Sequence, residues 1–321
     1  MPDTYTSTTT VPNLVTAAYD RYIRLALRAM PQFRTFADTR PVQQTHPGSS
    51  VIFSLYSDMA DATTTLNEVT DPEIQAIADP SRITVTLNEY GNYAVVTKKL
   101  QAFSLDGSLD ANLANMLAFN QASSIDTVVQ TVLAGTTNFV RESAGSLSTS
   151  AAITTIVGSD TAKARDFRYP VTKLRANNVM GTRGEHYAVV LHPEVAHDLR
   201  IETGSTGWRT PHEYVDTGNL YAAEIGTFEG GVFIESPRCL NSQRGSGAGA
   251  SQVRVYDSYV FGKEALAEAV AIEPHTVVNG AIVDPLDRKM SIGWYGLFGH
   301  SLFRPEALYK VQTASTVRPT V

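Results

Sequence analysis

Alternating hydrophobic and polar positions predict several β-strands along this chain. Residues 82–87 (Arg-Ile-Thr-Val-Thr-Leu) alternate strictly, and 51–56 is a β-prone run. A strand is also expected at 93–97, after a turn signal at 90–92. Alternation places successive side chains on opposite faces of a sheet. Further strands are expected at 187–191, 231–235, 252–257, 276–283 and 289–298.

Apolar residues at three- and four-residue spacing predict helices. Between Leu109 and Leu133 this spacing continues for about 25 residues, or about 37 Å. Ser108 is the expected N-cap, and Gly135 follows the C-terminus. One face of this long helix is expected to be buried, with Asn112, Asn115, Asn120 and Gln121 facing elsewhere. Shorter helices are expected at 14–30, at 166–180 with Pro170 near the first turn, at 193–200 and at 262–270.

Charge is segregated along the chain. The 321 residues have a net charge of −6, and 18% of them are charged, against roughly 25% in an average globular protein. Segment 58–79 contains six acids and no Lys or Arg, whereas 18–40 contains five Arg and two Asp. The N-terminal arm, the acidic loop and the long helix have little core of their own, so neighbouring subunits are expected to supply it.

Composition and targeting signals exclude several classes of protein. An acidic balance argues against nucleic acid as a direct ligand. Cys239 is the single cysteine, which excludes an internal disulfide framework and a cysteine zinc site. The start of the chain lacks the pattern of a secretory signal, and no apolar run reaches the roughly 20 residues of a membrane helix. The protein is therefore expected to be cytosolic when made, with no membrane partner.

Motifs for catalysis or cofactor binding are missing or wrongly spaced. His192 and His197 are five residues apart with Pro193 between them, so they fail the zincin spacing, and a strand-to-helix turn with His192 near the cap and Leu199 packed inward is expected. The glycines of 245–249 lack the context of a phosphate cradle and are expected to form a loop. Cys239 is expected to be a structural thiol. A catalytic pair of carboxylates stays an open alternative, since 32 acidic residues allow many pairs in space and none has a recognisable spacing. We predict no catalytic residue, no cofactor and no metal.

The mixed α+β order of these elements resembles the major capsid proteins of tailed bacteriophages with the Hong Kong 97-type fold, and looks closest to the branch typified by the capsid protein of phage N-four. The resemblance covers nearly the whole chain. It rests on the acidic loop before Glu89-Tyr90-Gly91-Asn92-Tyr93, Lys98-Lys99-Leu100, the 109–133 helix, His192-Pro193-Glu194 through Asp198-Leu199, Glu224-Ile225-Gly226 leading to Gly231-Val232-Phe233-Ile234-Glu235-Ser236, Tyr259-Val260-Phe261-Gly262-Lys263-Glu264-Ala265-Leu266, and Gly293-Trp294-Tyr295-Gly296-Leu297-Phe298-Gly299.

The resemblance implies a domain plan and a mechanical function. It implies self-assembly as hexamers and pentamers into an icosahedral shell that encloses double-stranded DNA, in the virion after assembly in the host bacterial cytoplasm. Scaffolding, portal and decoration proteins are candidate partners, and loops 203–218 and 241–251 would line the capsomer axes. The implied parts are an N-terminal arm at 1–45, an extended loop at 46–100, a peripheral domain with the spine helix at 101–135, an axial domain at 136–272 and returning peripheral strands at 273–321.

Two finer hypotheses follow. Some family members crosslink a loop lysine to a neighbour, but 51–97 contains no Lys and Lys98 and Lys99 are expected at the base of the loop, so no covalent crosslinks are expected. Arginines of the arm are expected to pair with loop acids of an adjacent subunit. The proposed inter-subunit residues are Arg21, Arg24, Arg28, Arg34, Arg40, Asp58, Asp61, Glu68, Asp71, Glu73 and Asp79.

Two alternatives to the phage capsid function stay open. One is an encapsulin-type shell around a cargo enzyme, and the other is a soluble two-domain α+β enzyme.

Overall fold

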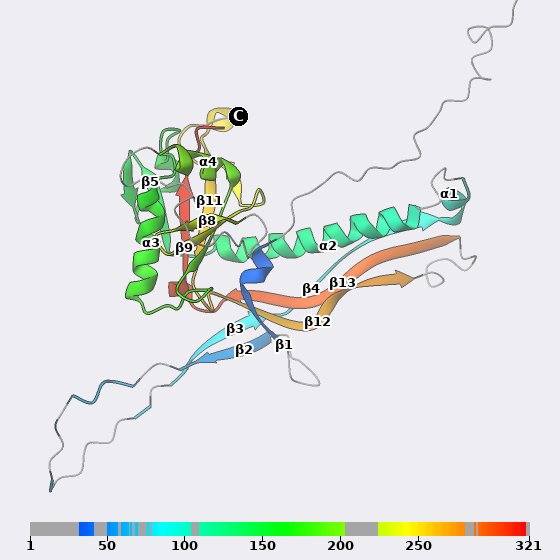
Figure 1. Ribbon diagram of the computed structural model, residues 1–321. Helices are drawn as coiled ribbons and strands as arrows, with labels where there is room; N and C mark the ends of the chain where they lie inside the picture. The colour runs from blue at the N-terminus through cyan, green and yellow to red at the C-terminus, as the bar shows by residue number, and fades with distance from the viewer. Residues whose placement is uncertain are drawn as a thin grey trace, which may run out of the picture.

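The chain folds into a larger sheet with two helices, a smaller sheet with one long helix, and a projecting hairpin (Figure 1). The computed structural model describes residues 32–41, 50–56, 79–103, 109–202, 224–279 and 288–318, together with a few positions within 59–77 and Leu286. The expected helix at 14–30, the expected cap Ser108 and the loop 203–218 lie outside the described residues.

The smaller sheet has four strands in the order β1-β12-β13-β4. β1 is parallel to β12, and the other neighbours are antiparallel. α2 lies along one face of this sheet, and the short helix α1 lies at the far end of β4 (Figure 1). The bounds are β1 Ala37–Pro41, β4 Asn88–Thr97, α1 Lys98–Phe103, α2 Leu109–Ala134, β12 Leu266–Asn279 and β13 Lys289–Leu302.

α2 confirms the predicted long helix, and at 26 residues it is about 39 Å long. Leu117 and Ile125 pack against the sheet, where Val270, Ile292, Trp294 and Phe298 form the opposing apolar surface. The prediction that Asn120 and Gln121 face elsewhere is wrong. Asn120 Oδ1 accepts a hydrogen bond from the Trp294 indole N–H at 3.0 Å, and Gln121 donates to the Pro274 carbonyl at 3.0 Å. The sheet presents polar groups to the helix, and these side chains satisfy them.

The larger sheet has the strand order β6-β5-β14-β11-β7-β9-β8, and β10 pairs with β11. All five residues of β7 are buried, as expected of a central strand covered on both faces. α3 and α4 pack on this sheet. The bounds are β5 Phe139–Ser143, β6 Ser146–Ser148, α3 Ala164–Ala176, β7 Tyr187–Leu191, α4 Pro193–Ile201, β8 Glu224–Phe228, β9 Gly231–Glu235, β10 Asn241–Gln243, β11 Arg254–Phe261 and β14 Leu308–Thr313, with 3-10 turns η2 Phe33–Phe36, η3 Ile153–Thr155, η5 Gly249–Ser251 and η6 Pro305–Ala307.

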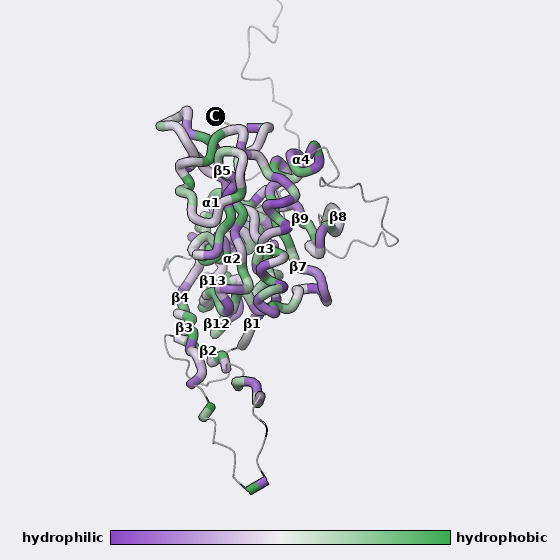
Figure 2. The backbone as a smooth tube through the Cα atoms, turned by 90° about the vertical axis from the view of Figure 1, so that its left-hand side faces the viewer, coloured by the Kyte–Doolittle hydropathy of each residue, from purple (hydrophilic) through white to green (hydrophobic). Residues whose placement is uncertain are grey.

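A two-stranded hairpin projects from the smaller sheet (Figures 1 and 2). It consists of β2 Ser50–Leu55 and β3 Ser81–Thr86, both near their predicted positions. Its base packs through Phe53 and Val85 against Ala267, Ala269 and Phe303. Gly299 permits this approach, because a Cβ there would lie 2.1 Å from the Thr86 carbonyl oxygen. A ribbon of two strands is marginal alone, so the base is what fixes the hairpin.

Three local predictions are wrong because tertiary structure outweighs local preference. The segment 262–270 is not a helix: 266–270 begins β12, where β1 and β13 flank it on both sides. The expected turn at 90–92 lies inside β4, where Gly91 fits close against the Trp294 carbonyl. Pro170 lies in the middle of α3 rather than in its first turn.

Two placements also differ from the expected plan. Lys98 and Lys99 begin α1, at the opposite end of the ten-residue strand β4 from the hairpin, so they do not lie at its base. The segment 273–321 divides between the sheets, because β14 pairs with β11 and β5 in the larger sheet. Parallel pairing with β5 places this last strand inside the larger core rather than beside β13.

Candidate assembly surfaces

The start of the described chain is fastened to α2 by one buried carboxylate. Phe33 is fully buried, and its backbone N–H donates to Asp126 Oδ1 at 2.9 Å. The other oxygen of Asp126 accepts from Arg238 Nε at 2.7 Å and from Gln130 at 3.2 Å. Asp126 therefore joins the arm, the long helix and the larger sheet region. A charge within an apolar helical stripe, between Ile125 and Val129, is the sequence signal that could have identified it.

A second buried carboxylate holds β1 to the smaller sheet. Glu268 of β12 accepts from Arg34 Nε at 2.8 Å and from the Thr39 hydroxyl at 2.6 Å, and His300 Nε2 lies 3.3 Å away. Burial alone raises the pKa of Glu268, but the approach of His300, the hydrogen bond from Thr39 and the charge of Arg34 outweigh burial and lower the pKa below its usual value. The expected helix at 262–270 concealed this role, because only a strand brings Glu268 beside β1.

The loop acids and arm arginines are only partly within the described residues. Asp61, Glu68 and Asp79 are exposed, and none of the three forms an ion pair within the described part of the chain. Arg34 is held by Glu268 and, at 3.3 Å, by Glu273 of the same chain. The predicted pairing of these acids with arginines of an adjacent subunit stays a prediction. Arg40 is in β1 opposite Ala269, while Arg21, Arg24, Arg28, Asp58, Asp71 and Glu73 lie outside the described residues.

Apolar side chains are exposed on the projecting segment and on one face of the smaller sheet. Val69, beyond the hairpin, is 92% exposed. In β4, Asn92 donates to Asn120 of α2, so the alternate positions Tyr93 and Val95 face away from the helix. Tyr93 is 72% exposed, and Gly293 of β13 separates it from exposed Val277. These exposed apolar side chains make the projecting segment and this sheet face candidate interaction surfaces.

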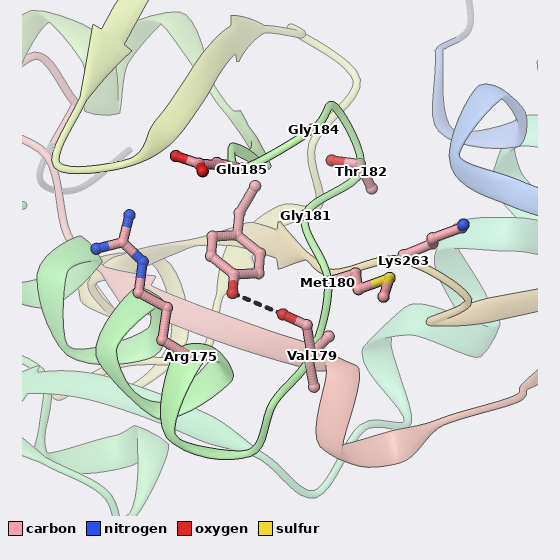
Figure 3. A pocket seen from close by; sticks show the side chains of 9 residues that line it. Arg175, Val179, Met180, Gly181, Thr182, Gly184, Glu185 and Lys263 are labelled. Atoms are coloured by element: carbon pink, nitrogen blue, oxygen red, sulfur yellow. Dashed lines mark hydrogen bonds between the residues drawn. The ribbon is translucent and has the colours of Figure 1, made fainter.

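The cleft beside Tyr187 does not resemble an active site. It is an open cleft of about 720 Å³ between the end of α3 and the connection from β11 to β12. Arg175 and Lys263 lie on opposite sides of the cleft and extend away from each other (Figure 3). Tyr187 donates to the Val179 carbonyl at 2.7 Å, and burial raises the pKa of its hydroxyl. The lining contains no His or Cys and no converging acid–base pair.

The residues considered for metal or thiol chemistry have structural positions. His192 is the N-cap of α4, where its Nδ1 accepts from the Glu194 N–H at 3.2 Å, and Leu199 is buried, as predicted. His197 is exposed on the same helix. Cys239 is buried, and burial raises the pKa of its thiol. Within the described ranges, no group of three His, Cys, Asp or Glu side chains could hold a metal ion. No described helix is long and apolar enough to span a membrane.

Comparison with known proteins agrees with this architecture. The family profile described as "Phage capsid protein" matches residues 6–309, whereas no curated protein matches significantly. Among solved structures, the capsid of the cyanophage P-SCSP1u is similar with a TM-score of 0.72 and 15% identity, covering 98% of this chain and 97% of that one. The capsid of Ralstonia phage GP4 has a TM-score of 0.74 and 12% identity, covering 94% and 96%. The chain belongs to the phage capsid protein family and has the Hong Kong 97-type fold.

Proposed function

We propose that this phage capsid protein is the major subunit of an icosahedral shell, assembled in the host cytoplasm from hexamers and pentamers around double-stranded DNA. The observation that carries the proposal is the family match over residues 6–309, together with capsid structures similar over the full chain. The match to phage capsids favours this function over a shell that holds a cargo enzyme. Scaffolding, portal and decoration proteins are proposed partners for assembly.

The parts of the subunit fit a shell in which neighbours complete each other. We assign the arm to 1–45 and the extended loop to 46–100. The smaller sheet and α2 form the peripheral domain, with its spine helix within 101–135, and the arm and loop ranges each contribute one edge strand to this sheet, β1 and β4. The larger sheet forms most of the axial domain at 136–272, to which β14 adds a strand from 273–321. The exposed apolar residues of the loop and of the free sheet face support this division, since both surfaces gain a covering in an assembly.

Charge segregation supports a specific contact between subunits. Asp61, Glu68 and Asp79 are exposed and without ion pairs among the described residues, so they are available to arginines of an adjacent arm. Each exposed pair contributes about 0–1 kcal/mol, but repetition at every interface of a shell multiplies the effect. Arg34 contributes less to this contact than Arg24 or Arg28, because Glu268 already holds its guanidinium.

Charge reversal tests this contact. Changing Arg24 and Arg28 to Glu should prevent shell formation, measured by sedimentation and electron microscopy, while circular dichroism shows a folded subunit. Reversing Asp61 and Glu68 to Arg in the same chain should restore particles, since the attraction is then re-formed with opposite signs. Normal shells from the arginine variant would overturn the proposed contact, and failure of the second pair of changes to restore them would assign the arginines to another partner.

A further inference from the structure

Two buried acids meet where β5 joins the first turn of α3. Glu142 is in β5, Asp166 is in the first turn of α3, and both residues are fully buried. Buried carboxylates ordinarily have donors on both oxygens. This pair lies within the larger sheet region, away from the hairpin and the arm, so it belongs to neither of the assembly surfaces described above.

Each acid has one satisfied oxygen and one orphaned oxygen. Glu142 Oε1 accepts from Lys163 Nζ at 2.8 Å and from Arg165. Asp166 Oδ2 accepts from the Lys163 backbone N–H at 2.9 Å. Glu142 Oε2 and Asp166 Oδ1 are buried without a donor. Arg165 Nε is 3.7 Å from Asp166 Oδ1, which is too far for a hydrogen bond.

Arg165 brings the two carboxyl groups to the same place, because it donates to Glu142 Oε1 and its Nε lies 3.7 Å from Asp166 Oδ1. Burial and then the charge of Glu142 raise the pKa of Asp166 to about 8. The Lys163 backbone N–H and the charge of Arg165 act in the opposite direction but are outweighed. Two facing acceptors form a hydrogen bond only when one of them carries a proton, so a shared proton would satisfy both orphaned oxygens.

The surrounding charges favour keeping that proton. The two cations that face the pair, Lys163 and Arg165, are 31% and 44% exposed in their side chains, so water screens their charge. Two more carboxylates are nearby: Glu202 accepts from the N–H of Ala164 at 2.7 Å, and Asp160 accepts from the β5–β6 turn. Acids therefore outnumber cations along this junction.

We infer that Glu142 and Asp166 share one proton and form a pH-sensitive lock between β5 and the start of α3. In the closed state the protonated oxygen of one acid donates to the free oxygen of the other. As the pH rises, the proton passes to water, two buried carboxylates face each other without a donor, and the junction loosens. The larger sheet region is then more stable in acid than in alkali.

The sign of the pH dependence follows from the direction of the shift. Asp166 holds a proton in the folded chain at pH values where the unfolded chain has lost it, so stability falls as the pH rises from about 4 to about 8 and is level above that. One extra proton makes the unfolding constant rise about tenfold per pH unit, or about a thousandfold between about pH 5 and about pH 8.

The test compares thermal and urea unfolding of the full chain from about pH 5 to about pH 9. Asp166→Asn keeps an N–H donor toward Glu142 Oε2 without a titrating proton, so the thousandfold dependence attributed to the pair should disappear. Glu142→Gln removes the negative charge that faces Asp166, so it should also flatten the dependence of the unfolding constant on pH. Asp160→Asn is the matched control: its carboxylate accepts three backbone N–H bonds, so its loss should lower stability at every pH with the wild-type slope.

Infrared spectroscopy of the wild-type protein reads the proton directly and needs no variant. Near pH 7 ordinary carboxyl groups are ionised, so the lock should give a protonated-carboxyl band that Asp166→Asn lacks and that fades above about pH 8. Absence of this band in the wild type, or equal pH slopes in wild type and Asp166→Asn, would overturn the inference.

Discussion

Replacing Asp126 tests whether one carboxylate joins the segment at Phe33, helix α2 and the connection that carries Arg238. In Asp126→Asn the amide oxygen still accepts from the Phe33 N–H, but the amide nitrogen then faces Arg238. A donor therefore meets a donor, and the guanidinium loses its counter-charge in a position where its side chain is 19% exposed.

The expected cost follows from this geometry. Breaking a buried ion pair by removing one partner costs about 3–5 kcal/mol. Arg238 keeps hydrogen bonds to the Ser123 carbonyl at 3.0 Å and to the Thr127 hydroxyl at 3.3 Å, which favours the lower end, about 3 kcal/mol. Asp126→Ala should cost about 1–3 kcal/mol more, since the buried Phe33 N–H then has no acceptor.

Urea unfolding of the purified subunit measures both losses. The matched control is Glu235→Gln, which removes the carboxylate of a pair with Arg200 at 3.0 Å whose side chains are 26% and 49% exposed. That change should cost about 0–1 kcal/mol, because water screens the pair. A loss below about 1 kcal/mol for Asp126→Asn would refute the role of this residue as a joint.

Three further predictions test the hairpin, the β1 anchor and the absence of crosslinks. Gly299→Ala should lower the melting temperature in calorimetry by displacing the hairpin base, because the new Cβ would lie 2.1 Å from the Thr86 oxygen; an unchanged value would contradict this packing. Glu268 has a lowered pKa, so its stabilisation is present above its usual value of 4.5 and is lost as the pH falls. The loss of unfolding free energy in Glu268→Gln should therefore be larger near pH 7 than near pH 4, and an equal loss at both would count against the ionic anchor. Denaturing gels of mature particles should show a single monomer band, because 51–97 contains no Lys; a ladder of covalent multimers would refute it.

Local pattern was sufficient where an element depends on its own residues. Residues 187–191 form a continuous apolar run, and the apolar residues of 109–133 recur at helical spacing. Each pattern specifies its own element, so both elements were predicted nearly to their ends. The alternation at 82–87 likewise found β3. Pattern failed at 262–270, where a run rich in Ala, Glu and Leu favours a helix in isolation. Two flanking strands decide its conformation, and neither lies nearby in the sequence.

The sequence alone could not identify the anchoring residues Asp126 and Glu268, for a related reason. Glu268 meets Arg34 across 234 positions, and Asp126 meets Arg238 across 112. Charge segregation pointed to arm arginines as partners of loop acids, but it could not show that Arg34 is engaged within its own chain. The carboxyl pair of Glu142 and Asp166 is similar, since no spacing marks two acids whose elements meet only in the folded chain.

Electron microscopy of the protein expressed together with the other head proteins of its phage shows directly whether the subunit builds a shell. We expect closed icosahedral particles whose reconstruction places the β2–β3 hairpin of each subunit against a neighbour. Recovery of the folded chain solely as a small soluble oligomer, with no closed particles under these conditions, would contradict it.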